Sequence, residues 1–361
     1  MFNIVTFILF ILMLTAIISI HEFGHLLAAK IFGVYVTEYS IGMGKQLYSH
    51  KGKETTFSIR LLPIGGYCAM VGDSDTSLET SPDVDIDSIP PERTLTGIAK
   101  WKKIIILLAG VFMNFVLALV IVSMVYLSMG KANVSPRAII NEVSAGSPAE
   151  SAGLLKDDEI ISARLENGYS IEPATFAELS DFLTLYEEGD IELVVLRNGE
   201  KMEIAVTPVY NEEMGSYKMG ISSYAYDTVD VDIFNCFSLA MSYLSEMTKL
   251  IWTSLLGLFK GVGLNNISGP VGIYNATSQA VSYGAVSYFL LGAVLSLNVG
   301  IFNLIPIPAL DGGRVVLTVI EAIIGRPIPP KLENIIMTAS VLLFILIMVF
   351  ATTHDIFRLL G

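Results

Sequence analysis

Four long runs without a charged residue decide what this chain can fold into. They cover residues 2–20, 104–130, 261–310 and 335–353. An α-helix needs about 20 apolar residues to cross the hydrocarbon core of a bilayer. We therefore predict a polytopic α-helical membrane protein whose four spans lie at about 4–29, 104–128, 285–305 and 334–353. The first half of the third run is rich in asparagine, glycine and proline, so only its second half is expected to span.

The first run has one alternative reading, a cleaved signal peptide. A signal peptide needs a basic segment before its apolar core and small residues at a cleavage site, and neither is present. We therefore expect the run to remain as a membrane anchor.

Lysine and arginine near the span ends predict the orientation. They gather in two connections, one between the first and second spans and one between the third and fourth. Both connections are expected to be cytoplasmic, which places residues 131–283 and both termini outside. Arg358 runs against this assignment.

The charge is concentrated in one place. The net charge is -13, although charged residues make up only 16% of the chain. Residues 131–283 hold 9 basic and 21 acidic residues, so this segment is expected to be soluble. An acidic balance argues against nucleic-acid binding, which requires clustered basic residues. Two cysteines, Cys68 and Cys236, exclude a disulfide framework.

Short β-rich runs alternate with turns between residues 132 and 210. A strand at 138–143 precedes a Gly-Ser-Pro-Ala turn, and a second strand follows at 159–163. Next come a helix at 175–186 and a hairpin around Asn198-Gly199, a favoured two-residue turn. This order resembles a circularly permuted PDZ domain of the protease-associated type. The resemblance implies a groove for an extended peptide or a C-terminus, bound by strand addition. A small α/β domain that serves only as a spacer is the alternative.

Residues 234–260 carry an apolar stripe at helical spacing that charged residues interrupt. Only ten uncharged residues separate Lys249 from Lys260, too few to span a bilayer. We predict an amphipathic helix at the outer interface, with a fifth span as the alternative.

The first span contains the sequence His21-Glu22-Phe23-Gly24-His25. Residues four apart share one face of a helix, so both imidazoles can reach one metal ion. Glu22 stands beside them as a general base. Burying these three polar residues in a bilayer is costly unless they bind something. The alternative is a polar end of the span at the cytoplasmic interface.

A catalytic zinc site needs a third protein ligand. His50 and His354 are poorly placed for this, which leaves Asp311 in the segment Asn303-Leu-Ile-Pro-Ile-Pro-Ala-Leu-Asp311-Gly-Gly. Its prolines must break the third span, and broken helix at membrane depth is tolerated where it lines a polar cavity. Asn303 offers an amide just before the break.

Together the HEFGH and NLIPIPALDGG segments resemble the site-2 protease family of intramembrane zinc metalloproteases. The PDZ-like insertion and the Gly110-Val-Phe-Met-Asn114 segment resemble its bacterial branch, which cleaves membrane-anchored substrates such as anti-sigma factors in regulated intramembrane proteolysis. The resemblance implies that His21, His25 and Asp311 bind Zn²⁺ and that Glu22 is the general base. It also implies that Asn303 positions the scissile segment or stabilises the oxyanion.

The resemblance also implies partners and a location. The substrates would be single-span membrane proteins, cleaved after a first cut. The enzyme would lie in the bacterial cytoplasmic membrane, with its active site near the cytoplasmic side and the PDZ-like domain outside. Only one PDZ-like unit fits this chain, whereas some members of the family carry two.

The connection after the first span predicts a membrane-associated β-hairpin, because 34–41 and 56–62 read as strands joined by a turn at 49–53. A free edge of this hairpin could accept an unwound substrate. Residues 72–92 read as a polar loop.

The predicted domains are the first span 1–33, the hairpin and loop 34–103, the second span 104–130, the PDZ-like domain 131–215, the linker and interfacial helix 216–283, the third span 284–333 and the fourth span 334–361.

Two other classes of function remain open from the residues. One is a non-catalytic, membrane-anchored PDZ receptor or scaffold, which would not need Glu22. The other is a metal transporter, which is disfavoured because the chain has no internal repeats. A serine or aspartyl intramembrane protease would need a Ser–His pair or a second intramembrane aspartate.

Overall fold

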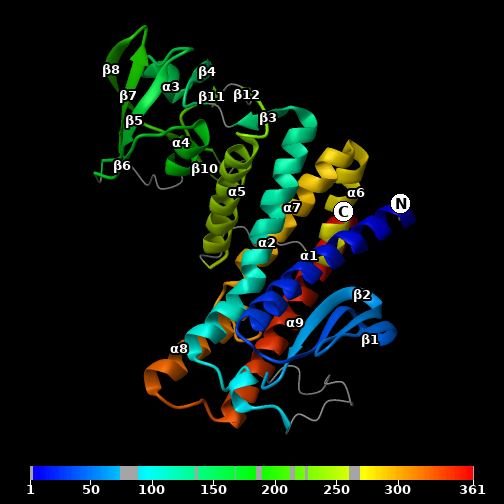
Figure 1. The fold of residues 1–361 in the computed structure, drawn as a ribbon. Helices are drawn as coiled ribbons and strands as arrows, with labels where there is room; N and C mark the ends of the chain where they lie inside the picture. The colour runs from blue at the N-terminus through cyan, green and yellow to red at the C-terminus, as the bar shows by residue number, and fades with distance from the viewer. Residues whose placement is uncertain are drawn as a thin grey trace. The chain divides into compact units, whose positions relative to one another are not determined.

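The fold is described by a computed structural model, drawn in Figure 1. It describes residues 3–73, 88–134, 137–166, 168–183, 189–211, 216–223, 227–259 and 269–360. The chain divides into two compact units. The first combines Met1–Ser128 with Ile233–Gly361, and the second is Met129–Asp232.

Four helices of the first unit are long and apolar enough to cross a membrane, as the sequence predicted. They are α1 (Ile4–Ile31), α2 (Lys100–Met129), α7 (Ala285–Asn303) and α9 (Pro330–Leu360), the last with its apolar part at Lys331–Thr353. Asn3 caps α1, because its side chain accepts a hydrogen bond from the Val5 amide. The chain is therefore a polytopic α-helical membrane protein with an inserted α/β PDZ-like domain and a membrane-associated β-hairpin.

Small residues let the spans approach one another closely. A Cβ atom on Gly24 of α1 would lie 2.3 Å from the carbonyl oxygen of Ala109 on α2. The hydroxyl of Ser296 on α7 donates to the backbone oxygen of Asn114 on α2 over 2.9 Å. Tyr288 donates in the same way to the Leu9 carbonyl of α1. Packing of this kind, with few polar links, is how helices associate in lipid.

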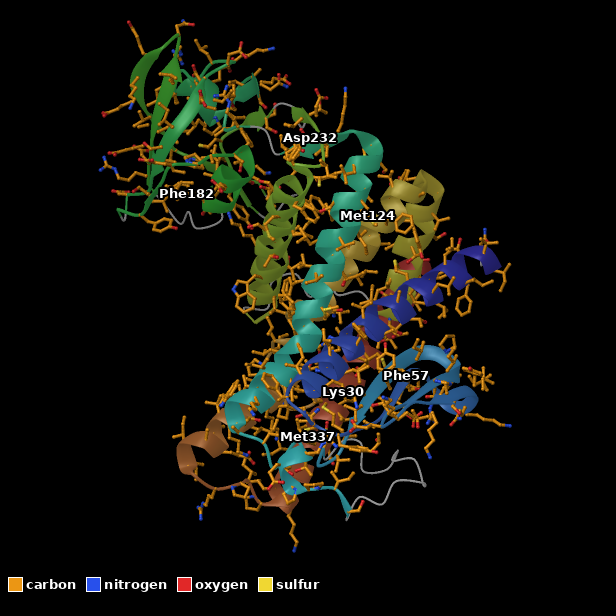
Figure 2. All side chains as sticks on the ribbon, viewed as in Figure 1. Lys30, Phe57, Met124, Phe182, Asp232 and Met337 are labelled. Atoms are coloured by element: carbon orange, nitrogen blue, oxygen red, sulfur yellow. The ribbon has the colours of Figure 1, made fainter. Side chains whose placement is uncertain are left out.

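The β-hairpin after α1 consists of two long, bent strands, β1 (Val36–Lys51) and β2 (Thr56–Met70). The first half of β1 pairs with both ends of β2, since Ser40 lies opposite Tyr67 on one side and Ser58 on the other. The turn predicted at 49–53 begins later, because β1 stays paired with β2 as far as Lys51. Tyr39 docks the hairpin on α1 by donating to the Ser19 carbonyl over 2.7 Å. Figure 2 labels Phe57, which packs on the ring of Tyr39.

The polar loop predicted at 72–92 lies mostly outside the described residues, although a short 3-10 helix, η2 (Pro91–Arg93), is seen at its end.

Shorter helices complete the first unit, namely α5 (Cys236–Phe259), α6 (Pro270–Tyr283) and α8 (Asp311–Ile324). In the polar half of the third uncharged run, the described residues form the helix α6, which Gly284 with φ of +112° separates from α7. Asp355 of α9 holds the start of α6 by accepting hydrogen bonds from the Gly269 and Gly272 amides.

Tyr243 of α5 packs against Tyr126 of α2. Our placement of α5 at the outer interface stays a prediction.

The second unit is built around an antiparallel sheet with the order β6-β5-β7-β8. Its helices α3 (Pro148–Ser151) and α4 (Phe176–Leu183) cover a core that contains Phe182, labelled in Figure 2. The predicted hairpin turn is present, with positive φ at Asn198 and Gly199. The strands of this sheet are β5 (Glu159–Arg164), β6 (Ser170–Ile171), β7 (Ile191–Arg197) and β8 (Glu200–Val206).

Three two-stranded sheets extend the second unit beyond residue 215. They pair β3 (Lys131–Val134) with β12 (Asp227–Asp230), β4 (Ile140–Val143) with β11 (Ile221–Ser223), and β9 (Val209–Asn211) with β10 (Ser216–Lys218). The predicted extent of the PDZ-like part, 131–215, stays a prediction, while the compact unit that contains it runs to Asp232.

Candidate metal centre

The two histidines of the HEFGH segment lie one turn apart on the same face of α1. Both are buried, with 7% of His21 and 6% of His25 exposed. Their Nε2 atoms are 3.2 Å apart. The helical spacing of four residues therefore brings both imidazoles to one point, as the sequence predicted.

Asp311 comes to the same point from the other end of the chain. Helix α7 ends at Asn303, and the prolines Pro306 and Pro308 prevent it from continuing. The chain turns, and Asp311 begins α8. Its Oδ2 atom lies 3.0 Å from His21 Nε2 and 3.4 Å from His25 Nε2.

The turn between α7 and α8 is tight because two glycines form its end. A Cβ atom on Gly312 would lie 2.4 Å from the Leu304 carbonyl oxygen, and one on Gly313 would lie 2.2 Å from the carbonyl group of Ile307. Glycine at both positions therefore allows the backbone to fold back and deliver Asp311 to the histidines.

These three donors fit a tetrahedral zinc ion. Ligands bound to zinc at about 2.0–2.1 Å lie about 3.3–3.4 Å from one another, close to the three separations seen here. Asp311 Oδ2 is buried and faces these two ring nitrogens, with no hydrogen bond of good geometry to it in the part of the chain that the structure describes. Buried carboxylate oxygens normally have a partner, and a cation between the three donors would supply one. No other group of three such ligands is found among the described residues.

Gly110 of α2 leaves room for both rings. A Cβ atom at this position would lie 2.5 Å from His25 Nε2 and 2.8 Å from His21 Nε2. Real Cβ atoms do not approach other atoms so closely, and here the neighbours are the two nitrogens that would bind the metal. The absence of a side chain at Gly110 is therefore part of the site.

Helix α2 also holds the other nitrogen of each ring. His25 Nδ1 lies 2.8 Å from the backbone oxygen of Ile106, which can only accept a hydrogen bond. The proton of His25 is therefore on Nδ1, and its Nε2 carries the free electron pair that a metal needs. His21 Nδ1 lies 3.3 Å from the amide nitrogen of Asn114.

All five residues predicted for the site line one cavity of about 310 Å³. Glu22 lies in it beside the ligands, and its carboxylate faces the backbone N–H of Cys68 on β2. Asn303 lines the same cavity from the end of α7. The edge of the hairpin thus forms one wall, since Tyr67 and Cys68 also line the cavity.

An ion pair between Arg314 and Asp73 separates this cavity from a second one of about 320 Å³. Both residues line both cavities. Arg314 lies on α8 one turn after Asp311, so the same helix provides a candidate metal ligand and one side of this partition.

The structure adds contacts that the sequence did not reveal. The role of Gly110 and the carbonyl of Ile106 depend on a close approach of α2 to α1, and no residue pattern in either helix reports it. Asn114 belongs to the Gly110–Asn114 segment already noted from the sequence, but its contact with His21 was not foreseen. Cys68 carried no signal beyond its residue type.

Comparisons with known proteins agree with this geometry. The profile of peptidase family M50 matches residues 9–347. The chain is 30% identical to the zinc metalloprotease RasP of Oceanobacillus iheyensis, over 98% of this chain and 99% of that protein. It is 29% identical to the regulator of sigma-W protease RasP of Bacillus subtilis, over 98% and 99% of the two chains.

Proposed function

This chain belongs to peptidase family M50 and is an intramembrane zinc metalloprotease, and we propose that His21, His25 and Asp311 hold its zinc ion. We propose further that Glu22 is the general base. One observation carries the assignment. Three metal-binding atoms from two distant segments meet within 3.0–3.4 Å in a cavity that also contains a glutamate.

The residues divide the work of peptide hydrolysis. Bound zinc would act as a Lewis acid and make water a nucleophile near neutral pH. Glu22 takes the proton of the attacking water and passes it to the amide nitrogen that leaves. Asn303 lines the same cavity and has an amide that can donate to the carbonyl of the scissile bond.

The substrate must be extended before it can be cut, because the carbonyls of a transmembrane helix are hydrogen-bonded within the helix. Strand β2 passes directly beside Glu22, since a Cβ atom on Gly66 would lie 3.7 Å from the Glu22 Cγ atom. We propose that an unwound substrate pairs with this edge of the hairpin and so reaches Glu22 as an added strand.

The class of substrate follows from the relatives. The Bacillus subtilis relative is named a regulator of sigma-W protease. We propose that this chain likewise acts on single-span proteins such as membrane-anchored anti-sigma factors, after a first cleavage. The PDZ-like domain would bind an extended peptide or a new C-terminus of such a substrate.

The enzyme is a bacterial membrane protein, and we propose its orientation from the charges. Basic residues gather in the connections that flank the site, including Arg93, Lys102 and Arg326. This distribution supports an active site near the cytoplasmic side and a PDZ-like domain outside the cytoplasmic membrane.

The test compares cleavage with zinc content in the full-length protein. Purified enzyme and a membrane-embedded single-span substrate are reconstituted in lipid vesicles. Replacing Glu22→Gln removes the base and keeps the ligands, so cleavage should fall on the order of 10²- to 10⁴-fold while one zinc per chain remains. Glu203→Gln, at an exposed site on β8, is the matched control and should cleave normally.

Two results would contradict the proposal. One is full cleavage by the Glu22→Gln variant. The other is wild-type cleavage that survives complete removal of zinc by a chelator. Both results are what a non-catalytic receptor co-purifying with another protease would give.

A further inference from the structure

The side chain of Asn114 makes a contact with a candidate zinc ligand that the mechanism above does not use. Asn114 is completely buried on α2, and its amide nitrogen lies 3.3 Å from His21 Nδ1. The oxygen of the same amide, Oδ1, is also buried and has no hydrogen-bond partner within the described residues. A buried amide oxygen without a hydrogen-bond partner lowers the stability of the fold by about 1–3 kcal/mol. We therefore looked for a partner that this oxygen could have in the zinc-bound protein.

The donor and acceptor atoms around His21 determine where its ring proton lies. An amide nitrogen can only donate, so it donates to His21 Nδ1, and the ring proton of His21 is then on Nε2. That Nε2 lies 3.0 Å from Asp311 Oδ2, a carboxylate oxygen that can only accept, and 3.2 Å from His25 Nε2. His25 can accept there because its own proton, on Nδ1, goes to the Ile106 carbonyl over 2.8 Å.

Zinc ligation needs the opposite arrangement at His21. A metal on Nε2 takes the electron pair of that atom, so the ring proton must move to Nδ1 and requires an acceptor there. Among the described residues, the amide of Asn114 is the group within hydrogen-bonding distance of this nitrogen. A half-turn of the amide about its Cβ–Cγ bond exchanges its nitrogen and oxygen, and it brings the unpartnered Oδ1 to Nδ1.

We propose that Asn114 is the positioning residue of His21. Its amide oxygen accepts the Nδ1 proton and holds the ring in the tautomer that binds zinc. The inference rests on the proposed zinc ligation by His21. Partners of this kind typically change metal affinity by roughly 10- to 100-fold when they are removed.

The two histidines therefore differ in the group that holds each ring in its zinc-binding tautomer. His25 is held by a backbone oxygen, which no substitution at Ile106 removes. His21 depends on a side chain that donates in one orientation and accepts in the other. Helix α7 keeps Asn114 in place, because Ser296 donates to its backbone oxygen and Gly300 lies against its Cβ atom.

The experiment measures zinc affinity by competition with a chelator, on full-length protein in detergent micelles. Asn114→Leu removes the acceptor and should weaken zinc binding roughly 10- to 100-fold. Asn114→Asp has only acceptor oxygens and should bind zinc at least as tightly as wild type. Ser123→Ala removes a buried hydroxyl from the same helix, away from His21, and should not change the affinity.

A second readout follows the tautomer itself. In ¹⁵N NMR spectra of zinc-loaded wild type, His21 should carry its proton on Nδ1. The Asn114→Asp variant should show the same tautomer, because aspartate cannot donate to that nitrogen.

Each outcome decides something. Wild-type zinc affinity in folded Asn114→Leu would overturn the inference. If the leucine variant does not fold, the aspartate variant decides alone, and an affinity loss of 10-fold or more in it would overturn the acceptor role. Failure of wild type to bind zinc would contradict the proposed function instead, so the two failures can be told apart.

Discussion

Gly110 shows how much of this site depends on one residue that has no side chain. The two imidazoles occupy space on the face of α2 that a Cβ atom at this position would fill. The nearest atoms would be the nitrogens assigned to the metal, which cannot move away without leaving the zinc. Room for the ligands is thus provided by α2, although α2 contributes no ligand.

Replacing Gly110→Ala should therefore reduce bound zinc strongly, to well below one ion per chain after dialysis against a weak chelator. The methyl group would lie within 3 Å of both Nε2 atoms and push the rings apart. Metal analysis of the purified variant measures this. Gly292→Ala is the control, because its methyl group would meet only Met13 at 3.5 Å, an ordinary contact. Equal zinc content in the two variants would show that the site tolerates the methyl group.

The residues to which we assign the chemistry could be named from the sequence, whereas the contacts that support them could not. The spacing of the HEFGH segment indicates His21, Glu22 and His25. The broken helix before Asp311 indicates that residue. Gly110 and Ile106 act through backbone proximity between α1 and α2. A single sequence holds no record of which turns of two helices cross.

At the scale of elements, the apolar runs predicted the spans well, since a membrane helix has one dominant requirement. The hairpin was predicted less completely. Its strands are longer than 34–41 and 56–62, because Ser40 pairs on both sides and the two strands bend to form a wider sheet. Residue alternation predicts a strand but does not say how many partners it has.

One strand of the second unit is held by an ion pair whose carboxylate is buried and whose arginine is partly exposed. Arg197, at the end of β7, binds Asp158 before β5 through two hydrogen bonds of 2.7 Å, and Asp158 is fully buried. Arg197 also donates to the Gly153 carbonyl over 2.8 Å. The pair therefore ties the central hairpin to the turn after α3.

Replacing Arg197→Ala should destabilise the second unit by about 3 kcal/mol, because it leaves a carboxylate buried without its cation. Hydrogen exchange measured by mass spectrometry on peptides from 129–232 would report the loss of protection. Arg164→Ala is the matched control, since Arg164 and its partner Glu192 are both 61% exposed, and exposed pairs contribute little. Similar exchange in both variants would show that the pair does not hold the unit.

At the scale of the whole molecule, the charge and the chemistry are separated. Met129–Asp232 holds 7 basic and 20 acidic residues, and the rest of the chain holds 15 of each. The net charge of -13 thus belongs to the PDZ-like unit, while the membrane unit that contains the candidate metal centre is neutral. The sequence had already placed the acidity between the second and third spans, and the unit boundary sharpens this.

We propose that the zinc ion of this protease is bound by two histidines and one aspartate. Cys68 is the informative competitor, because it lines the same cavity and thiolate sulfur is a good zinc ligand. Burial raises the pKa of the Cys68 thiol well above its ordinary value, which adds to the free-energy cost of forming the thiolate that zinc would bind.

X-ray absorption at the zinc edge of the full-length protein tests this claim most directly. We predict only nitrogen and oxygen neighbours at about 2.0–2.2 Å, with the outer-shell scattering of two imidazoles. The Asp311→Asn variant should lose zinc or change this shell. A sulfur neighbour at about 2.3 Å, or a shell that Asp311→Asn leaves unchanged at wild-type occupancy, would contradict the proposed ligands.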